Sequence, residues 1–531
     1  MQRRFLTIIA IVFAGIAALA VFLAIRGSLI AGFVREIAES RLSTALGQPV
    51  AMGQLGFSLM PRPAFTGSDI RVGNNAQQAP AVSLDRVEVF PVLRSFFRGP
   101  VHIPDVSLDG FTVSLLRDAD RRWRAPAVFP APTRGGGGGI GIDRVRVAGG
   151  RLLIFDVGVD GAMRERSRID DMRTELVVTP GGLRLAPLTG RVGGAAISGE
   201  AETDPQSVQL TFSAPAIRDA DLPALFGLLA ASRPAVVRIE EAEPVAASVS
   251  VRIDRATSRL TGSGTLRAPA LTIEPLRLQQ LNAPFIIQGT QLTFTPTTFT
   301  LNGGSHEGRF TLTLGDAGHP NAAAALGAPA PAWAMDGIVR DLDVGALLDT
   351  IAGRDAKLDG RGRIDAKLKG RFEPGFLTRM DGGTRLVLSN GVLHDFPLLA
   401  AVNRALRLSE GDGQDTRFEA LTASLAIARG TATTDDLVIQ AGYLRAVLSG
   451  RIGFDRSVDL RGRAIVAAER VAAGVDSIHE LARLRKGSGE IVVPLTITGS
   501  LDAPKFDIDV GTIIREGIVD ELRRRMRGLF K

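Results

Sequence analysis

The chain has 531 residues, and its composition rules out several classes of function. It contains no cysteine, which excludes disulfides, thiol nucleophiles and thiolate metal sites. The formal net charge of +7 arises from 63 basic and 56 acidic residues that are interspersed through most of the chain, and only 5% of the residues are aromatic. The basic excess is local, with its densest run at Arg523–Arg527, and the aromatic residues are scattered, so we expect no binding of nucleic acid.

The N-terminus carries an uncharged apolar run from Phe5 to Ile25. As a helix, this run is long enough to cross the roughly 30 Å hydrocarbon core of a bilayer. Because Arg3 and Arg4 precede it, the leader is expected to stay cytoplasmic and the rest of the chain to be exported. Ala18-Leu19-Ala20 resembles a signal-peptidase site, but it lies inside the apolar run, which is longer than the apolar h-region of a signal peptide, about 7 to 15 residues. We therefore expect a single-pass membrane anchor; in a bacterium this would be an inner-membrane anchor with the bulk of the chain in the periplasm.

The pattern after the anchor is mainly that of strands. A helix is expected from Ser28 to Leu46, and Gly47 ends it. Beyond it, apolar and polar residues alternate, which is typical of strands with one apolar and one solvated face. The clearest segments are Ala81–Phe90, Phe111–Arg117, Asp143–Val147, Gln291–Leu301 and Gly308–Leu314. The sequence therefore predicts a mostly β fold.

Short turns favour one long antiparallel sheet over parallel crossovers. Turns are expected at Asn302-Gly303-Gly304, Asn390-Gly391 and Asp359-Gly360. Proline- and glycine-rich stretches predict two linkers. The predicted organisation is a cytoplasmic leader and anchor (1–26), an N-terminal module (27–125), a linker (126–140), a middle β-rich module (141–318), a second linker (319–332), a C-terminal β module (333–509) and a terminal helix (510–531).

A few short helices are expected to cover the sheet. They are predicted at Asp221–Ala230, Asp343–Gly353, Pro397–Leu408 and Val475–Arg485. The terminal helix carries an apolar stripe beside several arginines. Two interpretations of this helix remain open: a cap over the exposed end of the sheet, or a basic amphipathic helix on an anionic membrane surface.

No catalytic or metal-binding motif is evident, so we expect no enzyme activity, metal or cofactor. The five histidines are widely separated, and the motifs of serine hydrolases and P-loop nucleotidases do not occur. Ser305-His306-Glu307 combines three catalytic residue types, but we interpret it as a solvated turn because triads assemble from separated segments. Asp170-Asp171 and Asp435-Asp436 are interpreted as surface turns.

Binding or transport is therefore favoured over catalysis. A long antiparallel sheet that curls along its length would line a trough with apolar side chains. An ordinary packed sandwich would produce the same alternation, so the sequence pattern leaves both arrangements open.

Several segments resemble the AsmA family of bacterial envelope proteins. The N-terminal resemblance covers Leu46–Asn74 and Val87–Asp118, directly after the expected anchor. The C-terminal resemblance covers Leu342–Gly370, Thr384–Leu406, Asp415–Ala464 and Val493–Asp509. The middle of the chain, about residues 140 to 330, is similar only in character.

The resemblance implies an inner-membrane protein with a large periplasmic β-rich body. Such a protein would be similar to the bridge-like carriers that move phospholipid toward the outer membrane. Related members have been linked to outer-membrane protein assembly and cell-envelope integrity. The resemblance is diffuse, and it assigns no individual functional residue.

Two hypotheses follow. In the first, an apolar β groove holds the acyl chains of phospholipid and supports lipid transport between the two membranes. Val89, Val113 and Leu312 are the candidate groove-lining residues, at which a charge should block transport. In the second, the protein is an envelope scaffold that binds outer-membrane or other envelope proteins through its sheet edges and encloses no lipid conduit.

Overall fold

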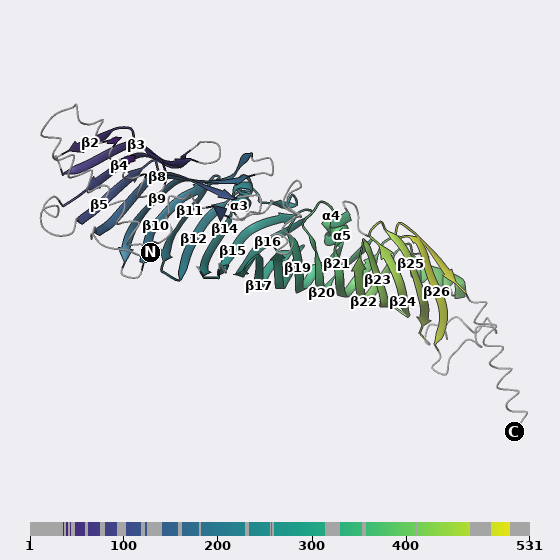
Figure 1. Cartoon of the computed structure of the whole chain (residues 1–531). Coiled ribbons are helices and arrows are strands. Elements are labelled where there is room, and N and C mark those ends of the chain that lie inside the picture. Colours follow the sequence, from purple (N-terminus) through teal and green to yellow (C-terminus); the bar gives the residue numbers. More distant parts are fainter. Residues whose placement is uncertain are drawn as a thin grey trace, which may run out of the picture.

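The computed structural model is dominated by one long twisted sheet (Figure 1). It describes residues 35–36, 39–40, 43, 48–58, 62–74, 80–92, 102–117, 123–124, 141–157, 162–179, 182–228, 233–254, 256–257, 260–313, 330–352, 357–406, 408, 413–467 and 490–509. Within these residues the protein is mostly β, with a few short helices. The prediction of a mostly β fold is confirmed.

Hydrogen bonds connect the strands into a single sheet. Strands β1 to β9 are Val50–Ala51, Leu55–Ser58, Ala64–Asn74, Pro80–Phe90, His102–Asp109, Thr112–Arg117, Trp123–Arg124, Gly141–Val157 and Met163–Thr179. Strands β10 to β18 are Gly182–Val192, Ala195–Thr203, Ser207–Ile217, Val237–Arg238, Val245–Asp254, Leu260–Ile273, Leu276–Gln288, Gln291–Leu301 and Gly304–Thr313. Strands β19 to β27 are Ala332–Asp343, Leu358–Arg371, Asp381–Leu393, Thr416–Ala428, Thr431–Ala441, Leu444–Gly453, Ser457–Val466, Ile491–Ser500 and Ala503–Ile508.

The sheet is antiparallel except near its N-terminal end. From β14 to β27 each strand pairs antiparallel with the next strand in the chain. The long strand β8, however, pairs in parallel with β5 along its first half and with β6 along its second half. The prediction of a long antiparallel sheet is therefore confirmed, with the parallel pairings of β8 as an exception.

Because consecutive strands alternate in direction, their turns form two long rims. We call the side that contains the turn at Gly289 between β16 and β17 the Gly289 rim, and the side that contains the turn at Asn302 between β17 and β18 the Asn302 rim. Helices α3 (Leu222–Leu228), α4 (Val344–Ala352) and α6 (Leu398–Leu406) follow strands that end at the Asn302 rim. The one-turn helix α5 (Phe376–Arg379) follows β20 at the Gly289 rim.

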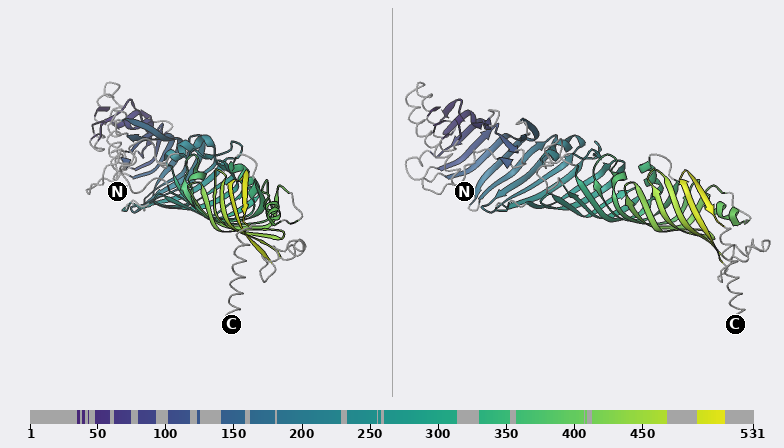
Figure 2. Two further views of the ribbon diagram at one scale, coloured as in Figure 1. Left: turned by 90° about the vertical axis from the view of Figure 1, so that its right-hand side faces the viewer. Right: turned by 45° about the vertical axis from the view of Figure 1, so that its right-hand side comes forward.

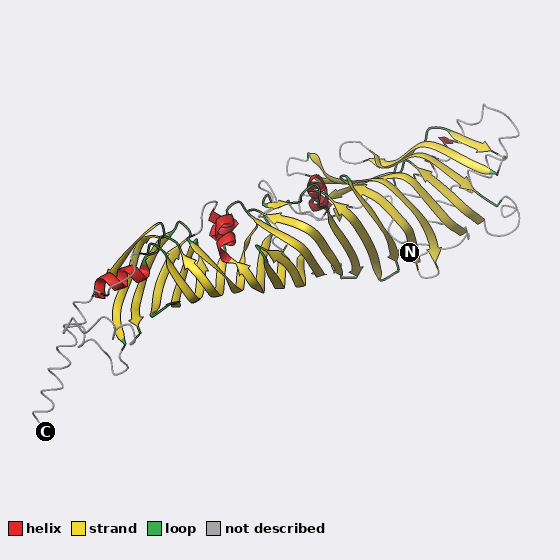
Figure 3. Cartoon of the chain, turned by 180° about the vertical axis from the view of Figure 1, so that it is seen from behind, coloured by secondary structure: helices red, strands yellow, loops and turns green. Residues whose placement is uncertain are grey.

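The sheet curls along its strands and twists along its length. Figure 2 shows this curl in the end-on view, and Figure 3 shows the helices along one side of the elongated body. The side chains of one sheet face meet inside the curl, where they form the buried clusters described below. The sheet therefore has a concave apolar face and a convex outward face.

Local sequence patterns placed several elements correctly. The strand predicted at Gln291–Leu301 is β17, and those at Ala81–Phe90 and Phe111–Arg117 lie over β4 and β6. The helices predicted near 221–230, 343–353 and 397–408 are α3, α4 and α6. Asn302 and Gly303 form a two-residue hairpin turn and have φ values of 45° and 78°.

Two predicted turns are instead irregularities within strands. Asn390, with φ 51°, lies inside β21, and Gly360 lies opposite it inside β20, where the pairing register shifts. Asparagine and glycine favour positive φ, and such a backbone can bend a strand as well as reverse it. The predicted turns at Asn390-Gly391 and Asp359-Gly360 are therefore wrong.

Some predicted segments lie outside the described residues. They are the anchor from Phe5 to Ile25, the linker 126–140, the helix 475–485 and the terminal helix 510–531. No helix among the residues that the structure describes is both long and apolar enough to cross a membrane. The division into modules stays a prediction, although hydrogen bonding is continuous from β8 through β18 into β19.

Candidate functional site

One lateral row of residues crosses the concave face from end to end. We call it the central row, and each member pairs directly with the next across neighbouring strands. Its members in order are Leu55, Gly67, Val87, Leu108, Val147, Thr174, Leu188, Gly199, Phe212, Val249, Gly264, Phe285, Phe294, Phe310, Met335, Leu368, Gly382, Ile427, Ala432, Ile452, Val458, Gly499 and Pro504.

The central row is apolar along almost its whole course. Every member is an apolar residue or a glycine except Thr174, whose hydroxyl is buried without a hydrogen-bond partner among the described residues. Neighbouring strands are about 4.8 Å apart, so the row is about 100 Å long. The concave face therefore has a continuous apolar floor much longer than the core of an ordinary domain.

A second row runs beside the central row and lies closer to the Gly289 rim in the middle of the sheet. Its members in order are Phe65, Val89, Val106, Val145, Leu176, Leu185, Ala201, Leu210, Val251, Gly262, Ile287, Leu292, Leu312, Trp333 and Gly370. All members of this second row are apolar residues or glycine, and the indole nitrogen of Trp333 is the only polar side-chain atom among them. The floor is thus at least two residues wide over much of its length.

Aromatic rings lie directly over glycines in this floor. A β-carbon at Gly264 would come within 2.4 Å of Phe285, so only glycine leaves room for that ring. Phe285 then contacts Phe294 at 5.2 Å between ring centroids, and Phe294 contacts Phe310 at 5.9 Å. Aromatic rings favour tilted arrangements at such distances, so these contacts stabilise the pairs. The glycines thus leave room for the phenylalanine rings, and both residue types keep the floor apolar.

An aromatic cluster brings the two rims of the sheet together. Trp333, Phe372 and Phe376 come from the Gly289 rim, with ring centroids 5.9 Å apart in each pair. Val236, which lies at the Asn302 rim beside β13, is buried in the same cluster, and Ile273 packs against it. The curl therefore closes far enough near β19 and β20 for opposite rims to touch.

Before this aromatic cluster, the floor is only partly covered. The apolar residues Leu210, Phe212, Val249, Val251, Ile253, Leu260, Leu292 and Leu312 are half-buried. Helix α3 and the segment around Ile239 cover the part of the floor next to the Asn302 rim. Between β12 and β18 the concave face therefore keeps apolar side chains in contact with solvent.

After the aromatic cluster, the concave face is closed. Ile491, Val493 and Ile497 of β26 have no exposed surface, and Leu398, Val402 and Leu406 of α6 cover them and their neighbours. Two hydrogen bonds, one at the first residue of helix α6 and one in its second half, hold the helix in place. The Leu398 amide donates to the Thr416 hydroxyl at 3.0 Å, and the Tyr443 hydroxyl donates to Asn403 at 2.7 Å.

The convex face is polar by contrast. Asp336 of β19 pairs in register with Arg309 of β18 and Lys367 of β20, and the Lys367 ammonium lies 3.7 Å from the Asp336 carboxylate. Exposed pairs of this kind contribute little to stability. The convex face is thus more polar than the concave face, although the outward side chains of Ile286 and Val387 are 49% and 40% exposed.

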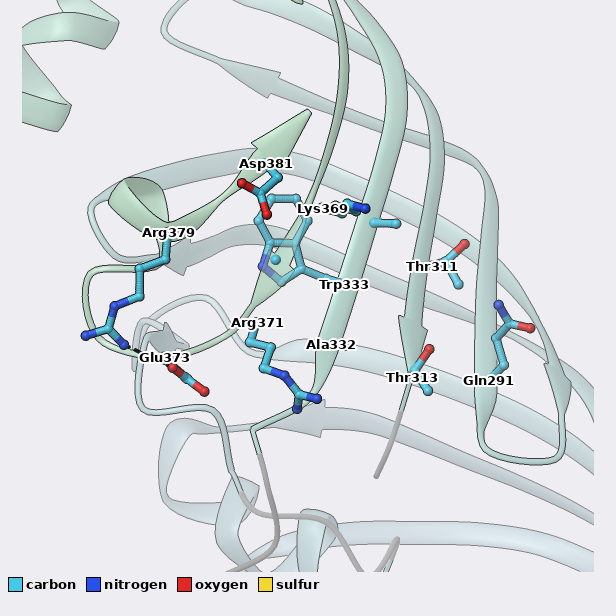
Figure 4. A pocket seen from close by; sticks show the side chains of 12 residues that line it. Gln291, Thr311, Thr313, Ala332, Trp333, Lys369, Arg371, Glu373, Arg379 and Asp381 are labelled. Carbon is cyan, nitrogen blue, oxygen red and sulfur yellow. Dashed lines mark hydrogen bonds and ion pairs between the residues drawn. The ribbon is translucent and has the colours of Figure 1, made fainter. Parts of the chain in front are cut away.

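A hollow of about 590 Å³ lies across the Gly289 rim beside the aromatic cluster (Figure 4). Inward residues Trp333 and Gly370 line it together with residues of the convex face. The other lining residues are Gln291, Thr311, Thr313, Ala332, Ala334, Lys369, Arg371, Glu373, Arg379 and Asp381. The hollow thus borders both the buried aromatic cluster and a charged outer surface.

The structure places the three candidate groove-lining residues in different surroundings. Val89 and Leu312 belong to the same second row, whereas Val113 lies in another row, paired with Val82 and Leu152. Val89 and Val113 are 2% and 6% exposed, inside the N-terminal cluster. Leu312 is half-buried beside the aromatic cluster.

The interpretation of Ser305-His306-Glu307 as a solvated turn is wrong. These residues lie in β18, and His306 is 3% exposed and stacks on Phe299 with ring centroids 4.2 Å apart. Burial lowers the pKa of His306 to about 4, although the nearby Glu307 carboxylate acts in the opposite direction. His306 is therefore a neutral part of the concave face.

The paired acids also lie in strands, not turns. Asp170 and Asp171 belong to β9, and Asp435 and Asp436 belong to β23. The Asp436 carboxylate accepts from the Ser424 amide at 2.6 Å where the pairing of β22 and β23 is interrupted, and this bond lowers its pKa. In the part of the chain that is described, no group of histidine and acidic residues has the arrangement of a metal site.

The sequence did not indicate the aromatic cluster or the hollow. Trp333, Phe372 and Val236 are far apart in the chain, and the curl of the sheet brings them together. Neither a family model nor a curated protein matches this sequence. The resemblance to the AsmA family therefore depends on the sequence segments alone.

Proposed function

We propose that the protein binds the acyl chains of phospholipid on its concave face and supports lipid movement between the membranes of a bacterial envelope. The single observation that carries this proposal is the apolar central row, which runs the length of the sheet and is partly uncovered between β12 and β18. The apolar run from Phe5 to Ile25 supports an inner-membrane anchor with the body in the periplasm.

Transfer of an acyl chain onto this floor is favourable for a simple reason. Each methylene that leaves water contributes about 0.8 kcal/mol. Half-buried residues such as Val249 and Val251 would lose their remaining contact with water at the same time. The lipid headgroup would stay at a rim, where water and polar side chains can solvate it.

Crosslinking from neighbouring positions of β14 tests the proposal. Val249 faces the trough, and Ser248 faces outward on the same strand. A photoreactive phenylalanine analogue at each position is irradiated in cells, and the purified full chain is analysed by mass spectrometry. We expect phospholipid adducts at position 249 and few or none at position 248. Equal lipid labelling at both positions, or none at either, would overturn the proposal.

The second candidate function is an envelope scaffold, and the closed C-terminal core favours it for that part of the protein. Residues of β26 are fully buried beneath α6, so acyl chains have no uncovered floor there. The same crosslinking experiment separates the two functions. Protein adducts without lipid at position 249 would favour the scaffold.

A further inference from the structure

The hollow at the Gly289 rim combines an apolar ring, a cation and several uncharged polar groups. Trp333 provides an apolar ring that belongs to the trough, and Lys369 provides a cation on the convex face. The hydroxyls of Thr311 and Thr313 and the carboxamide of Gln291 line the opposite wall. An amphipathic ligand that lies across the rim would find a suitable surface for both of its parts.

Lys369 is the cation that remains available in this hollow. Arg379 is paired with Glu373 at 3.0 Å, and Arg371 donates to the Ala330 carbonyl at 3.0 Å. Lys369 stands opposite Asp381 in register, but among the described residues it forms no ion pair, unlike Lys367 two positions earlier. An ammonium without a partner attracts phosphate or carboxylate oxygens.

Trp333 provides a second, independent sign of a ligand. The residue is 7% exposed, and its indole Nε1–H has no acceptor among the residues described. Figure 4 shows this nitrogen on the side of the ring that faces Glu373 and Arg379. A buried N–H normally has an acceptor, and tryptophan favours sites where an apolar region borders a polar one.

From these observations we propose that the hollow binds the phosphate ester of a phospholipid headgroup, with Lys369 as its cation, while the acyl chains lie on the floor beside Leu312. The inference rests on the proposed function and adds a place where lipid crosses the rim. Lys369 provides the charge, Trp333 marks the boundary between headgroup and acyl chain, and Asp381 opposes the binding of an anion.

The test measures binding of soluble lipids to the full chain. The sequence contains only two tryptophans, so Trp123→Phe leaves Trp333 as the sole indole reporter at the site. Dihexanoyl phosphatidylglycerol carries both parts of the ligand, dihexanoylglycerol lacks the phosphate, and glycerol 3-phosphate lacks the chains. In this background we expect Lys369→Ala to weaken phosphatidylglycerol binding about fivefold to tenfold and to leave dihexanoylglycerol binding unchanged.

Two further variants control the charge effect. Lys367→Ala removes a lysine from the same face of β20 outside the hollow and should leave both affinities unchanged. Asp381→Asn removes the opposing carboxylate and should strengthen phosphatidylglycerol binding about twofold to threefold. Equal effects of Lys369→Ala and Lys367→Ala would overturn the proposal.

The lipids also separate this inference from the function on which it rests. If dihexanoylglycerol binds as tightly as phosphatidylglycerol, the headgroup site is wrong while acyl-chain binding stands. If neither lipid binds, the proposed function itself fails. If glycerol 3-phosphate binds as tightly as phosphatidylglycerol, the hollow takes free phosphate esters, and the assignment to a lipid headgroup is overturned.

Discussion

The indole of Trp333 lies over Gly370 on the neighbouring strand, where a β-carbon would come within 3.1 Å of its Cζ2 atom. This close approach allows the ring to lie flat against β20 and to reach Phe376 and the Asn302 rim. A side chain at position 370 would displace the ring. The meeting of the two rims therefore depends on a residue that has no side chain.

We expect Gly370→Ala to lower the free energy of unfolding by about 1 to 2 kcal/mol, because Trp333 must shift to admit the new methyl group. Gly383→Ala on β21 is the control, since its β-carbon would meet nothing closer than 3.6 Å. Denaturant unfolding of the two variants checks the prediction. Equal stability of both variants would mean that Trp333 does not depend on Gly370.

Truncation of apolar side chains should separate the closed and the uncovered parts of the concave face. Leu495→Ala empties a site that is 1% exposed and should cost about 2 to 5 kcal/mol. Val251→Ala removes less buried surface from the half-buried floor and should cost about 1 kcal/mol or less. The free energies of unfolding, measured in denaturant, give the comparison. Similar costs would show that the floor near Val251 is as closed as the core under α6.

Charges at the three candidate groove-lining residues should have different effects. Val89→Asp and Val113→Asp place a carboxylate in the buried N-terminal cluster and should destabilise the fold by several kcal/mol. Leu312→Asp, at a half-buried position, should leave the protein folded and reduce the amount of bound lipid. Thermal unfolding and lipid extraction from the purified full chain measure both effects. Loss of folding in all three variants would contradict this distinction.

His306 should make the protein acid-sensitive. Burial lowers its pKa from 6.5 to about 4, so below pH 6.5 the unfolded chain takes up a proton that the folded chain does not. Stability should therefore fall between pH 6.5 and pH 4, by up to about 3 kcal/mol from this residue. In His306→Leu this part of the pH dependence should disappear, which unfolding curves at pH 7 and pH 4.5 would reveal.

His394 should have the opposite effect. A hydrogen bond to Asp359 at 2.8 Å, and the more distant Asp415, raise its pKa above 6.5. The stability that it contributes is present in full below pH 6.5 and is lost as the pH rises through the folded-state pKa. We expect His394→Gln to lower the melting temperature at pH 5 and to have little effect at pH 9. An equal decrease at both pH values would exclude a charged interaction.

Local pattern was sufficient for the strands and for some turns. The alternation in Gln291–Leu301 predicted β17, and Asn302-Gly303 predicted its hairpin, because both depend on neighbouring residues only. The turn predicted at Asn390-Gly391 was wrong for the same reason. A residue with positive φ can occur in a hairpin turn or at an irregularity within a strand, and the local sequence is similar in both cases. The choice between them depends on strand partners that lie elsewhere in the chain.

The candidate site was harder to predict. The burial of His306 does have a local sequence signal. His306, Phe310 and Leu312 are separated by even numbers of residues, so they lie on the same, inward face of β18. The contact between the two rims has no such signal, because it depends on the accumulated curl of the sheet between Val236 and Trp333. Family resemblance and anchoring in the inner membrane stay predictions.

The central row also relates the length of the protein to the number of its strands. From β14 onward each strand supplies one residue to the row, so every antiparallel pair of strands there extends the body by about 10 Å. From β14 onward consecutive strands are neighbours in space, and a duplicated or deleted hairpin would leave the remaining register intact. Evolution could therefore adjust the distance that such a protein bridges in steps of one hairpin, independently of the surface that touches the cargo.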